Sequence, residues 1–541
     1  MIRRLFTLTS LAGAWLSPMI AAAATINVTT TSSAINAGDG VCSLPEAVTA
    51  ANTNSNYSGC TRQGTGSADT IRLGAGTYNA ASTLSITSDV TISGAGQGST
   101  TIALSGGSSL SIPTGASIRR LSLIGLRVTA GGLSNCVVVS AGLATLRDAT
   151  LESCYIGLQV LSGGSANATS SKFLNNVYGI STGGKLELLS SDVTGSAATG
   201  ISVGSTGDAT IQNGYVAYNR RTGISVSGGR ASVTTTYLHS NHDDGSRGGG
   251  IRAVNGANLQ VASSTIAFNE STRGGGGINS EYSEVRVSDT LIDSNFCYGS
   301  TCIGGGIRTV GSGGGVGFTL TDSNVVNNLS QGNGGGVGLT TLNGTAFMAV
   351  RSSISKNTAS NNGGGLYSLS QEDIIASTIS GNVAGQRGGG VYHEGSGELH
   401  IFESTVAFNE ANETGGMYVH SAGNPMNFGN VFARNTSTVG NRDLRVPPGF
   451  PGGSFSWGTN LLLTDNTGIS SAPFGAVYVV ANPRLGPLTL INGRFVHPLL
   501  SGSPAIDQGF TYTNAPDGFD NVKRARPVNG RVDLGAIEFA P

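Results

Sequence analysis

One sequence phrase recurs between Phe173 and Asn435 and constrains the fold more than any other feature. In each copy an apolar residue stands three positions before an Asn, and a short polar loop and a run of Gly follow. The Asn positions are Asn176, Ser196 as a polar substitute, Asn219, Asn241, Asn269, Asn295, Asn328, Asn357, Asn382, Asn409 and Asn435. The apolar positions are Phe173, Val193, Val216, Leu238, Ile266, Ile292, Val325, Ile354, Ile379, Val406 and Phe432. Steps of roughly 20 to 33 residues are typical of a solenoid, whose units bury their apolar faces against one another.

The pattern inside each unit predicts short strands. Apolar residues alternate with polar ones, as in Val285-x-Val287 and Leu399-x-Ile401, and Gly and Asn clusters mark the turns between them. Wound coils of this kind stack parallel strands about 4.8 Å apart. We expect Gly and Asn at the corners because they accept a positive φ, and we expect the stacked Asn side chains to form a ladder. The residues after the Gly runs should form a second interior column: Ile251, Ile278, Ile307, Val337, Leu366, Val391 and Met417.

These repeats resemble the right-handed parallel β-helix superfamily, which includes pectate-lyase-like proteins and autotransporter passengers. The resemblance covers residues 65–440 and implies an all-β fold, a right-handed parallel β-helix. It is specific for the fold and says little about function.

The charge composition gives no sign of a nucleic-acid partner. The 541 residues include 84 Gly and only 11% charged residues, against averages of about 7% Gly and about 25% charge. The formal net charge is −1, so the chain lacks the basic surface expected of a nucleic-acid-binding protein.

The first 24 residues are typical of a secretory signal peptide. Arg3-Arg4 precede an apolar stretch from Leu5 to Ile20, and Ala22-Ala23-Ala24 fits a cleavage site before Thr25. We prefer the general export route to the twin-arginine route because the basic region is minimal. No second apolar stretch is long enough to span a membrane, so we expect a secreted protein or one displayed on the bacterial cell surface or outer membrane.

Six cysteines behind an export signal favour disulfides over a metal site or a catalytic thiol. By spacing they form three pairs: Cys42 with Cys60, Cys136 with Cys154, and Cys297 with Cys302. The second pair could tie neighbouring coils, and the third would pinch a single loop. Other pairings stay open at the level of sequence.

The stretch 42–52 predicts one helix within an N-terminal cap, residues 25–64. Ser43 and Glu46 form a capping box, Pro45 is tolerated in the first turn, and an apolar stripe follows. A solenoid needs such a cap over its first open coil. The stretch, with Gly59-Cys60 after it, resembles the "CSLREA" motif of secreted bacterial β-helix proteins, except that Pro45 replaces Arg.

The repeat fades after Asn435, and residues 441–541 form a separate C-terminal segment. The stretches 503–509 and 526–538 resemble the "choice-of-anchor" segment of bacterial surface and secreted proteins. Asp507, Asp533 and Glu538 could bind a cation through oxygen ligands. The alternative, which we prefer, is that these carboxylates close turns.

The loops between each Asn and the next Gly run should stack into one ridge that is unusually rich in charge. The catalytic candidates on this ridge are His242, Asp243, Asp244 and Arg247. The ligand-binding candidates are Arg220, Arg221, Glu270 and Arg273. Paired carboxylates would suit a glycoside hydrolase, and a basic residue with a neutralising cation would suit a lyase of uronic acids. The simpler interpretation is a row of solvated loop charges, because the motif sets of polygalacturonases and pectate lyases are missing.

Two hypotheses for function follow. The first is a secreted or surface-displayed structural or adhesion protein that binds a polysaccharide or cell-surface glycan along the ridge. The second is a polysaccharide lyase or glycoside hydrolase with an unfamiliar acidic site. We expect a monomer without a cofactor, with calcium as the one alternative.

Overall fold

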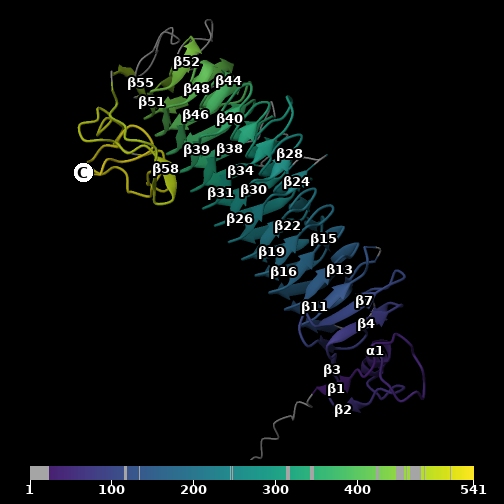
Figure 1. Cartoon of the computed structure of the whole chain (residues 1–541). Helices are drawn as coiled ribbons and strands as arrows, with labels where there is room; N and C mark the ends of the chain where they lie inside the picture. Colours follow the sequence, from purple (N-terminus) through teal and green to yellow (C-terminus); the bar gives the residue numbers. More distant parts are fainter. Residues whose placement is uncertain are drawn as a thin grey trace, which may run out of the picture.

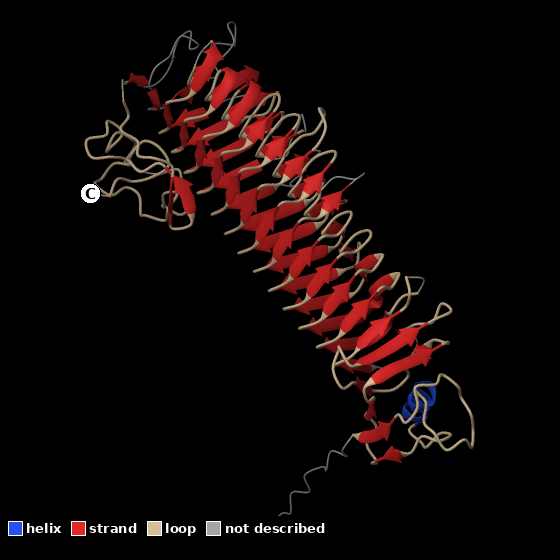
Figure 2. Cartoon of the chain, viewed as in Figure 1, coloured by secondary structure: helices blue, strands red, loops and turns tan. Residues whose placement is uncertain are grey.

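The computed structural model of the chain describes residues 23–114, 119–132, 134–243, 245, 248–311, 317–340, 347–421, 426–440, 442–445, 456–457, 460–462, 477–480, 482–511 and 513–540. These residues form a parallel β-solenoid of about 13 turns with a single short helix at its N-terminal end (Figure 1, Figure 2). The right-handed parallel β-helix predicted from the sequence is confirmed. Within the described residues, no helix is long and apolar enough to cross a membrane.

Each regular coil contributes one strand to each of three long sheets. Sheet I comprises β15 (Tyr178–Thr182), β18 (Ile201–Val203), β21 (Ile224–Ser227), β25 (Ile251–Val254), β29 (Ile278–Glu281), β33 (Ile307–Val310), β37 (Val337–Leu339), β41 (Leu366–Ser368), β45 (Val391–Glu394), β49 (Met417–Ser421) and β53 (Leu444–Arg445). Sheet II comprises β16 (Lys185–Leu189), β19 (Asp208–Gln212), β22 (Arg230–Thr234), β26 (Asn258–Ala262), β30 (Glu284–Ser288), β34 (Phe318–Thr321), β38 (Phe347–Val350), β42 (Glu372–Ile375), β46 (Leu399–Phe402) and β50 (Met426–Phe428). Sheet III comprises β12 (Thr150–Glu152), β14 (Lys172–Leu174), β17 (Asp192–Thr194), β20 (Tyr215–Ala217), β23 (Tyr237–His239), β27 (Thr265–Ala267), β31 (Leu291–Asp293), β35 (Asn324–Val326), β39 (Ser353–Ser355), β43 (Thr378–Ser380), β47 (Thr405–Ala407) and β51 (Val431–Ala433). In the earlier coils, β11 (Val137–Arg147) and β13 (Ile156–Thr169) run through both sheets I and II.

A fourth, narrower sheet carries the predicted ridge. Sheet IV comprises β24 (His242–Asp243), β28 (Glu270–Ser271), β32 (Phe296–Cys297), β36 (Leu329–Ser330), β40 (Thr358–Ala359), β44 (Val383–Arg387), β48 (Glu410–Glu413) and β52 (Thr436–Val439). Each of its strands begins one residue after an Asn of the repeat.

Both predicted interior columns are confirmed by the strand registers. In sheet I, Ile251 pairs with Ile278, which pairs with Ile307, and the column continues to Met417. In sheet III, Phe173 pairs with Val193, and the apolar positions stay in register to the last copy. These side chains belong to one continuous hydrophobic core.

The Asn residues form the predicted ladder. From Asn219 to Asn435, each Nδ2 donates to the Oδ1 of the next Asn at 2.8–3.0 Å. The same oxygen also accepts the backbone N–H of the preceding Asn, as Asn357 Oδ1 does from Asn328. Asp443 ends the ladder by accepting from Asn435.

The reason for the Asn at the corner differs from our prediction. The positive φ falls on the residue before each Asn, which we call the corner position, and side chains as different as Ser240 (51°) and Lys356 (56°) occupy it. The Asn is needed for its buried side chain, and the Gly run is needed to make room for it. A Cβ on Gly306 would lie 3.0 Å from the Cγ of Asn328, and the equivalent contact recurs along the Gly column.

All three cysteine pairings predicted from spacing are present as disulfides. Cys154 stands at an Asn position, and its N–H donates to Asn176 Oδ1 at 2.8 Å. Cys136 precedes the sheet I part of β11, at the position that Gly holds in later coils. The second disulfide therefore closes one coil in place of an Asn–Gly pair and does not tie neighbouring coils.

The predicted cap helix is α1 (Leu44–Thr53), and its Ser43–Glu46 capping box is formed. It lies between β1 (Ala24–Asn27) and β3 (Asp69–Arg72), which pair in parallel. The helix is therefore inserted into the first coil, whose backbone it covers. Residues 1–22, where the signal peptide is predicted, lie outside the described residues.

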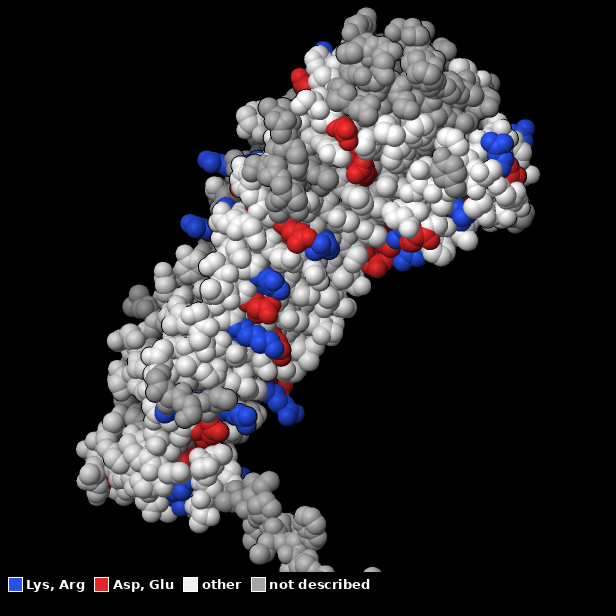
Figure 3. Space-filling view, turned by 180° about the vertical axis from the view of Figure 1, so that it is seen from behind, with Lys and Arg blue, Asp and Glu red and all other residues white. Residues whose placement is uncertain are grey.

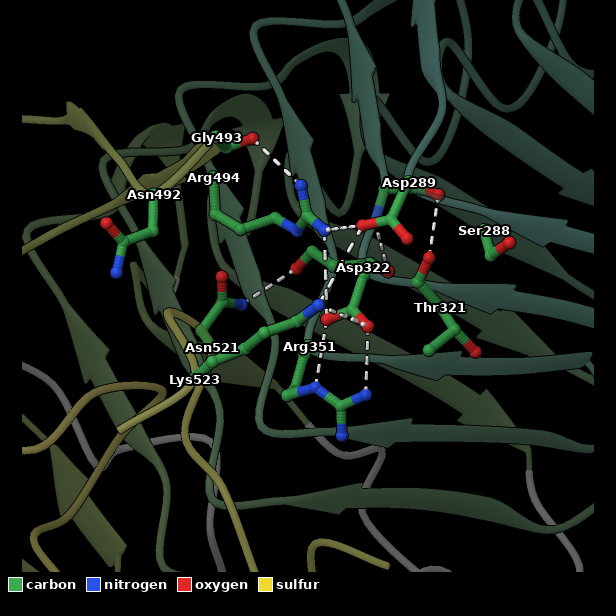
Figure 4. A network of polar contacts seen from close by, with 12 residues as sticks. Ser288, Asp289, Thr321, Asp322, Arg351, Asn492, Gly493, Arg494, Asn521 and Lys523 are labelled. Atoms are coloured by element: carbon green, nitrogen blue, oxygen red, sulfur yellow. Dashed lines mark hydrogen bonds and ion pairs between the residues drawn. The ribbon is translucent and has the colours of Figure 1, made fainter. Parts of the chain in front are cut away.

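The C-terminal segment folds back onto the outer face of the solenoid. Arg351 forms a bidentate ion pair with Asp322 at 2.9 and 3.0 Å, and Arg494 and Lys523 of the segment join the same cluster (Figure 4). A second apolar cluster lies between the segment and sheet III. The carboxylate of Asp533 accepts the N–H groups of Asp507 and Phe539, and Glu538 accepts the N–H of Asp533, which agrees with the preferred turn-closing interpretation.

Candidate functional site

Among the ridge candidates whose side chains are described, His242 and Glu270 contact each other. His242 on β24 and Glu270 on β28 are neighbours in register, and His242 Nδ1 lies 2.5 Å from Glu270 Oε2. Both side chains are partly exposed. Sheet IV brings them together because each follows an Asn by one residue, so both point outward from stacked short strands.

Two aromatic residues extend this pair along sheet IV. Phe296 is the next neighbour of Glu270 in register, and its ring meets that of Tyr298 edge-on at 3.8 Å. Burial, and then the neighbouring Glu270 carboxylate, raise the pKa of Tyr298. The Tyr298 hydroxyl therefore stays protonated at neutral pH.

The other predicted residues divide into three groups: a buried carboxylate, exposed arginines, and residues outside the described ranges. Asp243 is buried, and its carboxylate accepts the N–H of Gly245 at 3.3 Å. Arg220, Arg221 and Arg273 are exposed at the same edge of the coil. The remaining catalytic candidates, Asp244 and Arg247, lie outside the described residues.

An aromatic cluster lies on the outer side of sheet III, across the Asn ladder from the His242–Glu270 pair. The ring of His239 lies 4.9 Å from that of Tyr215, 4.9 Å from that of Tyr218 and 4.7 Å from that of Tyr237. Its Nε2 contacts the Tyr215 hydroxyl at 2.5 Å. Burial lowers the pKa of His239 and raises the pKa of Tyr215, so both groups are neutral at neutral pH.

Large apolar surface is exposed at this cluster. Tyr218 is 58% exposed, Phe268 is 54% exposed and Tyr237 is 38% exposed. We call Tyr215, Tyr218, Tyr237, His239 and Phe268 the aromatic face. Exposed aromatic rings gathered in one place mark binding surfaces more often than chance.

The fold does not require aromatic side chains at these corners. Tyr218 and Phe268 occupy corner positions with φ of 58° and 55°, a conformation that bulky residues rarely adopt. The corner between them holds Ser240, and the corner after them holds Ser294. A small polar residue therefore meets the structural need, and the two exposed rings call for another explanation.

The aromatic face and the His242–Glu270 pair form one surface around the corner of the coil. It offers flat rings that can stack on sugar rings, a hydroxyl and imidazole network, the carboxylates of Asp192, Glu270 and Asp293, and the guanidinium groups of Arg220 and Arg221. Among the described residues, no group of three His, Cys, Asp or Glu side chains is arranged to hold a metal ion.

The aromatic face was not predicted from the sequence because the aromatic residues are scattered along the chain. Tyr215 and Tyr237 are one coil apart and pair in register, which their distance from successive Asn residues could have shown. Tyr218 and Phe268 each stand immediately before an Asn. Alignment on the Asn positions, applied to the polar and aromatic residues as well as to the core, would have revealed the face.

Comparisons with known proteins give distant likenesses to solved structures. No protein-family profile and no curated protein matches the chain. Among solved structures, it is similar to pectate lyase Pel9A (13% identity, 87% of this chain and 88% of that chain, TM-score 0.32). It is also similar to the catalytic domain of Agl-KA (16% identity, 84% and 68%, TM-score 0.30). A third is the catalytic unit of a thermostable GH87 α-1,3-glucanase from Streptomyces thermodiastaticus strain HF3-3 (12% identity, 76% and 64%, TM-score 0.22).

Proposed function

We propose that this chain binds an extended polysaccharide on its aromatic face and the adjoining ridge. The observation that carries the proposal is the pair of exposed rings, Tyr218 and Phe268. They occupy corner positions that Ser fills in neighbouring coils. They stand two coils apart, so they can contact different sugars of one extended chain. Tyr237 and the buried His239, whose ring centroids lie 4.7 Å apart, stand on β23 in the coil between them.

The charge at the surface favours an acidic glycan. Arg220, Arg221 and Arg273 are exposed in the loops after Asn219 and Asn269, Glu270 already contacts His242, and Asp192 and Asp293 stand on sheet III beside Tyr215 and Ala267. Guanidinium groups bind carboxylates in a planar, bidentate geometry. A polyuronate is therefore the preferred ligand class.

The setting that we propose is extracellular. The three disulfides are typical of oxidising compartments, and the expected signal peptide and the CSLREA-like and choice-of-anchor-like stretches support export and surface display. On this proposal the protein acts as a monomeric adhesion or structural component that holds a glycan of another surface.

The test is depletion of the purified mature chain, from Thr25 on, by a panel of polysaccharides. The panel contains polygalacturonate, alginate and neutral glucans, each with and without calcium. We expect binding to the polyuronates, and we expect Tyr218→Ala and Phe268→Ala each to weaken it about tenfold, as the loss of about 1.4 kcal/mol of ring contact would.

Tyr282→Ala is the matched control because Tyr282 is also exposed (48%) and also has a positive φ, but lies between sheets I and II. Its binding should equal that of the unmodified chain. Binding that survives both face substitutions, or that the control weakens equally, would refute the proposed surface.

The contact between His242 and Glu270 favours a second candidate function, a polyuronate lyase. With Nδ1–H donating to Glu270, Nε2 of His242 carries the lone pair of a general base. The base would take the C5 proton of a uronate, a C4=C5 double bond would form, and the C4–O bond would break, with solvent protonating the leaving oxygen. A hydrolase would need a second carboxylate at this pair, and Asp243, the adjoining candidate carboxylate that the structure describes, is buried.

Released oligosaccharides decide between binding and cleavage. Unsaturated ends that disappear in Glu270→Gln and His242→Gln, with binding retained, would establish a lyase. Depletion of the protein without any released product would leave the binding function alone.

A further inference from the structure

The outer side of sheet III is divided into an open half and a covered half. In the open half, β20, β23 and β27 carry or adjoin the aromatic face. In the covered half the outward side chains are small and buried, including Ser353, Ser355 and Ala407. Figure 1 shows the C-terminal segment, in yellow, beside the half of the solenoid that contains β39 and β51.

Specific contacts fix the segment on the covered half. Ser380 on β43 contacts His497 at 2.7 Å, and Thr405 on β47 accepts the N–H of Ala536 at 3.0 Å. The amide of Asn521 donates to the carbonyl oxygens of Ser352 and Ala376. An apolar cluster between the two surfaces completes the contact.

The edge of the segment toward the aromatic face is a hairpin of β57 (Thr489–Ile491) and β58 (Arg494–Val496). Asn324 on β35 donates to the carbonyl oxygen of Gly493 at 2.7 Å, and Arg494 contacts Asp289 at 3.0 Å (Figure 4). β31 is the last strand before the hairpin, and its Leu291 and Asp293 are only half-buried.

The corner positions become covered one coil further along the solenoid. Ser294 and Asn327 are not among the residues covered by the segment, whereas the ammonium group of Lys356 lies 5.3 Å from the centre of the Phe495 ring. Two coils further on, the ring of Phe408 stacks on that of His497, with the ring centroids 4.7 Å apart. The segment therefore covers sheet III from β35 onward and its corner from the coil of Lys356 onward.

The hairpin stands as a wall at one end of the aromatic face. A strand packed on a sheet rises about 10 Å above it, which is higher than a sugar chain lying flat on the rings. Four coils, from that of Tyr215 to that of β31, are open before the wall. They provide about 20 Å of surface along the solenoid axis. Toward the N-terminal coils, β17 and β14 continue sheet III without a wall from this segment.

We propose that the aromatic face is a blind-ended track that binds the terminus of a linear polyuronate lying along the solenoid axis, with the β57–β58 hairpin stopping the chain end. The inference rests on the proposed glycan-binding function and adds the part of the glycan that is recognised. An internal stretch of a long chain cannot lie along this track because the chain would have to pass through the hairpin.

Chain length provides the test. Oligogalacturonates of increasing length, up to the polymer, are titrated into the full mature chain, and affinity is expressed per mole of glycan chains. A track that takes only chain ends gives an affinity that rises until the four coils are filled and then stays constant. An open track offers more registers on a longer chain, so its affinity per chain would keep rising in proportion to length, and that result would overturn the inference.

End labels provide a second measurement that needs no protein variant. A bulky fluorophore is attached either to the reducing end or to the non-reducing end of an oligomer longer than the track. We expect the label to abolish binding at one end and to leave it unchanged at the other. Equal binding of both labelled forms would overturn the inference, whereas absence of binding at every length would refute the proposed function itself.

Discussion

At the level of single residues, each regular coil is closed by an amide that needs a glycine opposite it. Asn328 illustrates the arrangement. Its Nδ2 donates to Asn357 Oδ1 and to the carbonyl oxygen of Ile292, each at 3.0 Å, and its Oδ1 accepts from Asn295. The Gly306 facing it leaves no room for a Cβ. The pairing explains why Asn and Gly recur together along the chain.

Asn328→Ala should destabilise the protein more than an ordinary polar substitution. It leaves the N–H of Asn295 and the carbonyl oxygen of Ile292 buried without their partner, at about 1–3 kcal/mol for each group. Urea unfolding measures the loss. Asn327→Gly is the control, because Asn327 is the exposed corner residue next to it and has a φ of 55°. A loss for Asn328→Ala no larger than the control's would contradict the ladder's structural role.

A second residue-scale prediction concerns a polar pair inside the core. Glu372 and His393 are both fully buried, with Glu372 Oε1 2.7 Å from His393 Nδ1, and Ser368 donates to the other carboxylate oxygen at 2.6 Å. In their columns, Phe347 and Leu399 flank Glu372, and Ser368 and Val419 flank His393. The contact between the two side chains and the Ser368 hydrogen bond together compensate for their burial.

We expect Glu372→Leu alone and His393→Leu alone each to cost about 3–5 kcal/mol, because each leaves the other group buried and unpaired. The double variant should recover most of that loss, since Phe347, Leu399 and Val419 are apolar neighbours for the new side chains. A double-mutant cycle by chemical denaturation gives the coupling. Additive losses would show that the two side chains do not stabilise each other.

At the level of elements, the columns of strands were predictable and the docking of the C-terminal segment was not. The apolar columns of sheets I and III follow from a spacing that repeats at short range, so the sequence predicts them directly. The contact of Asn521 with Ser352 joins residues 169 positions apart, and no periodicity links them. The His242–Glu270 contact was close to predictable, because both residues directly follow an Asn. It also required knowing that the short strands after each Asn stack as sheet IV.

The docked segment should loosen as the pH falls. Burial lowers the pKa of His497 from its ordinary 6.5 to about 4, so the docked state holds the ring neutral between Ser380 and the carbonyl oxygen of Gly486. A group with a lowered pKa contributes stability that is complete above 6.5 and is lost as the pH falls toward 4, about 3 kcal/mol in total. Hydrogen exchange of residues 482–511 against pH measures the loss.

His497→Leu should remove this pH dependence, whereas His420→Leu, at an exposed histidine, should keep it. Glu538 acts in the opposite direction, because burial raises its pKa to about 7 and its contribution is lost as the pH rises from 4.5 toward 7. The difference between the profiles of the unmodified chain and His497→Leu isolates the histidine. Identical profiles for these two proteins would contradict the assignment.

At the level of the whole molecule, the solenoid separates stability from recognition. The core, the Asn ladder and the disulfides repeat along the axis and do not depend on the aromatic face. Charged side chains are sparse, and on the face seen in Figure 3 the blue and red groups lie near one another without a field of one sign. Recognition on this account therefore depends on a local set of rings and cations and not on the net charge of −1.

The measurement that tests the central claim most directly is hydrogen exchange of the full mature chain with and without polygalacturonate. We expect slower exchange at β20, β23, β27 and β31 and at the neighbouring corners, and no change in sheet II. Because it uses the unmodified protein, the experiment does not depend on any variant folding. Protection confined to sheet II, or to the coils covered by the C-terminal segment, would contradict the assignment of the aromatic face as the glycan-binding surface.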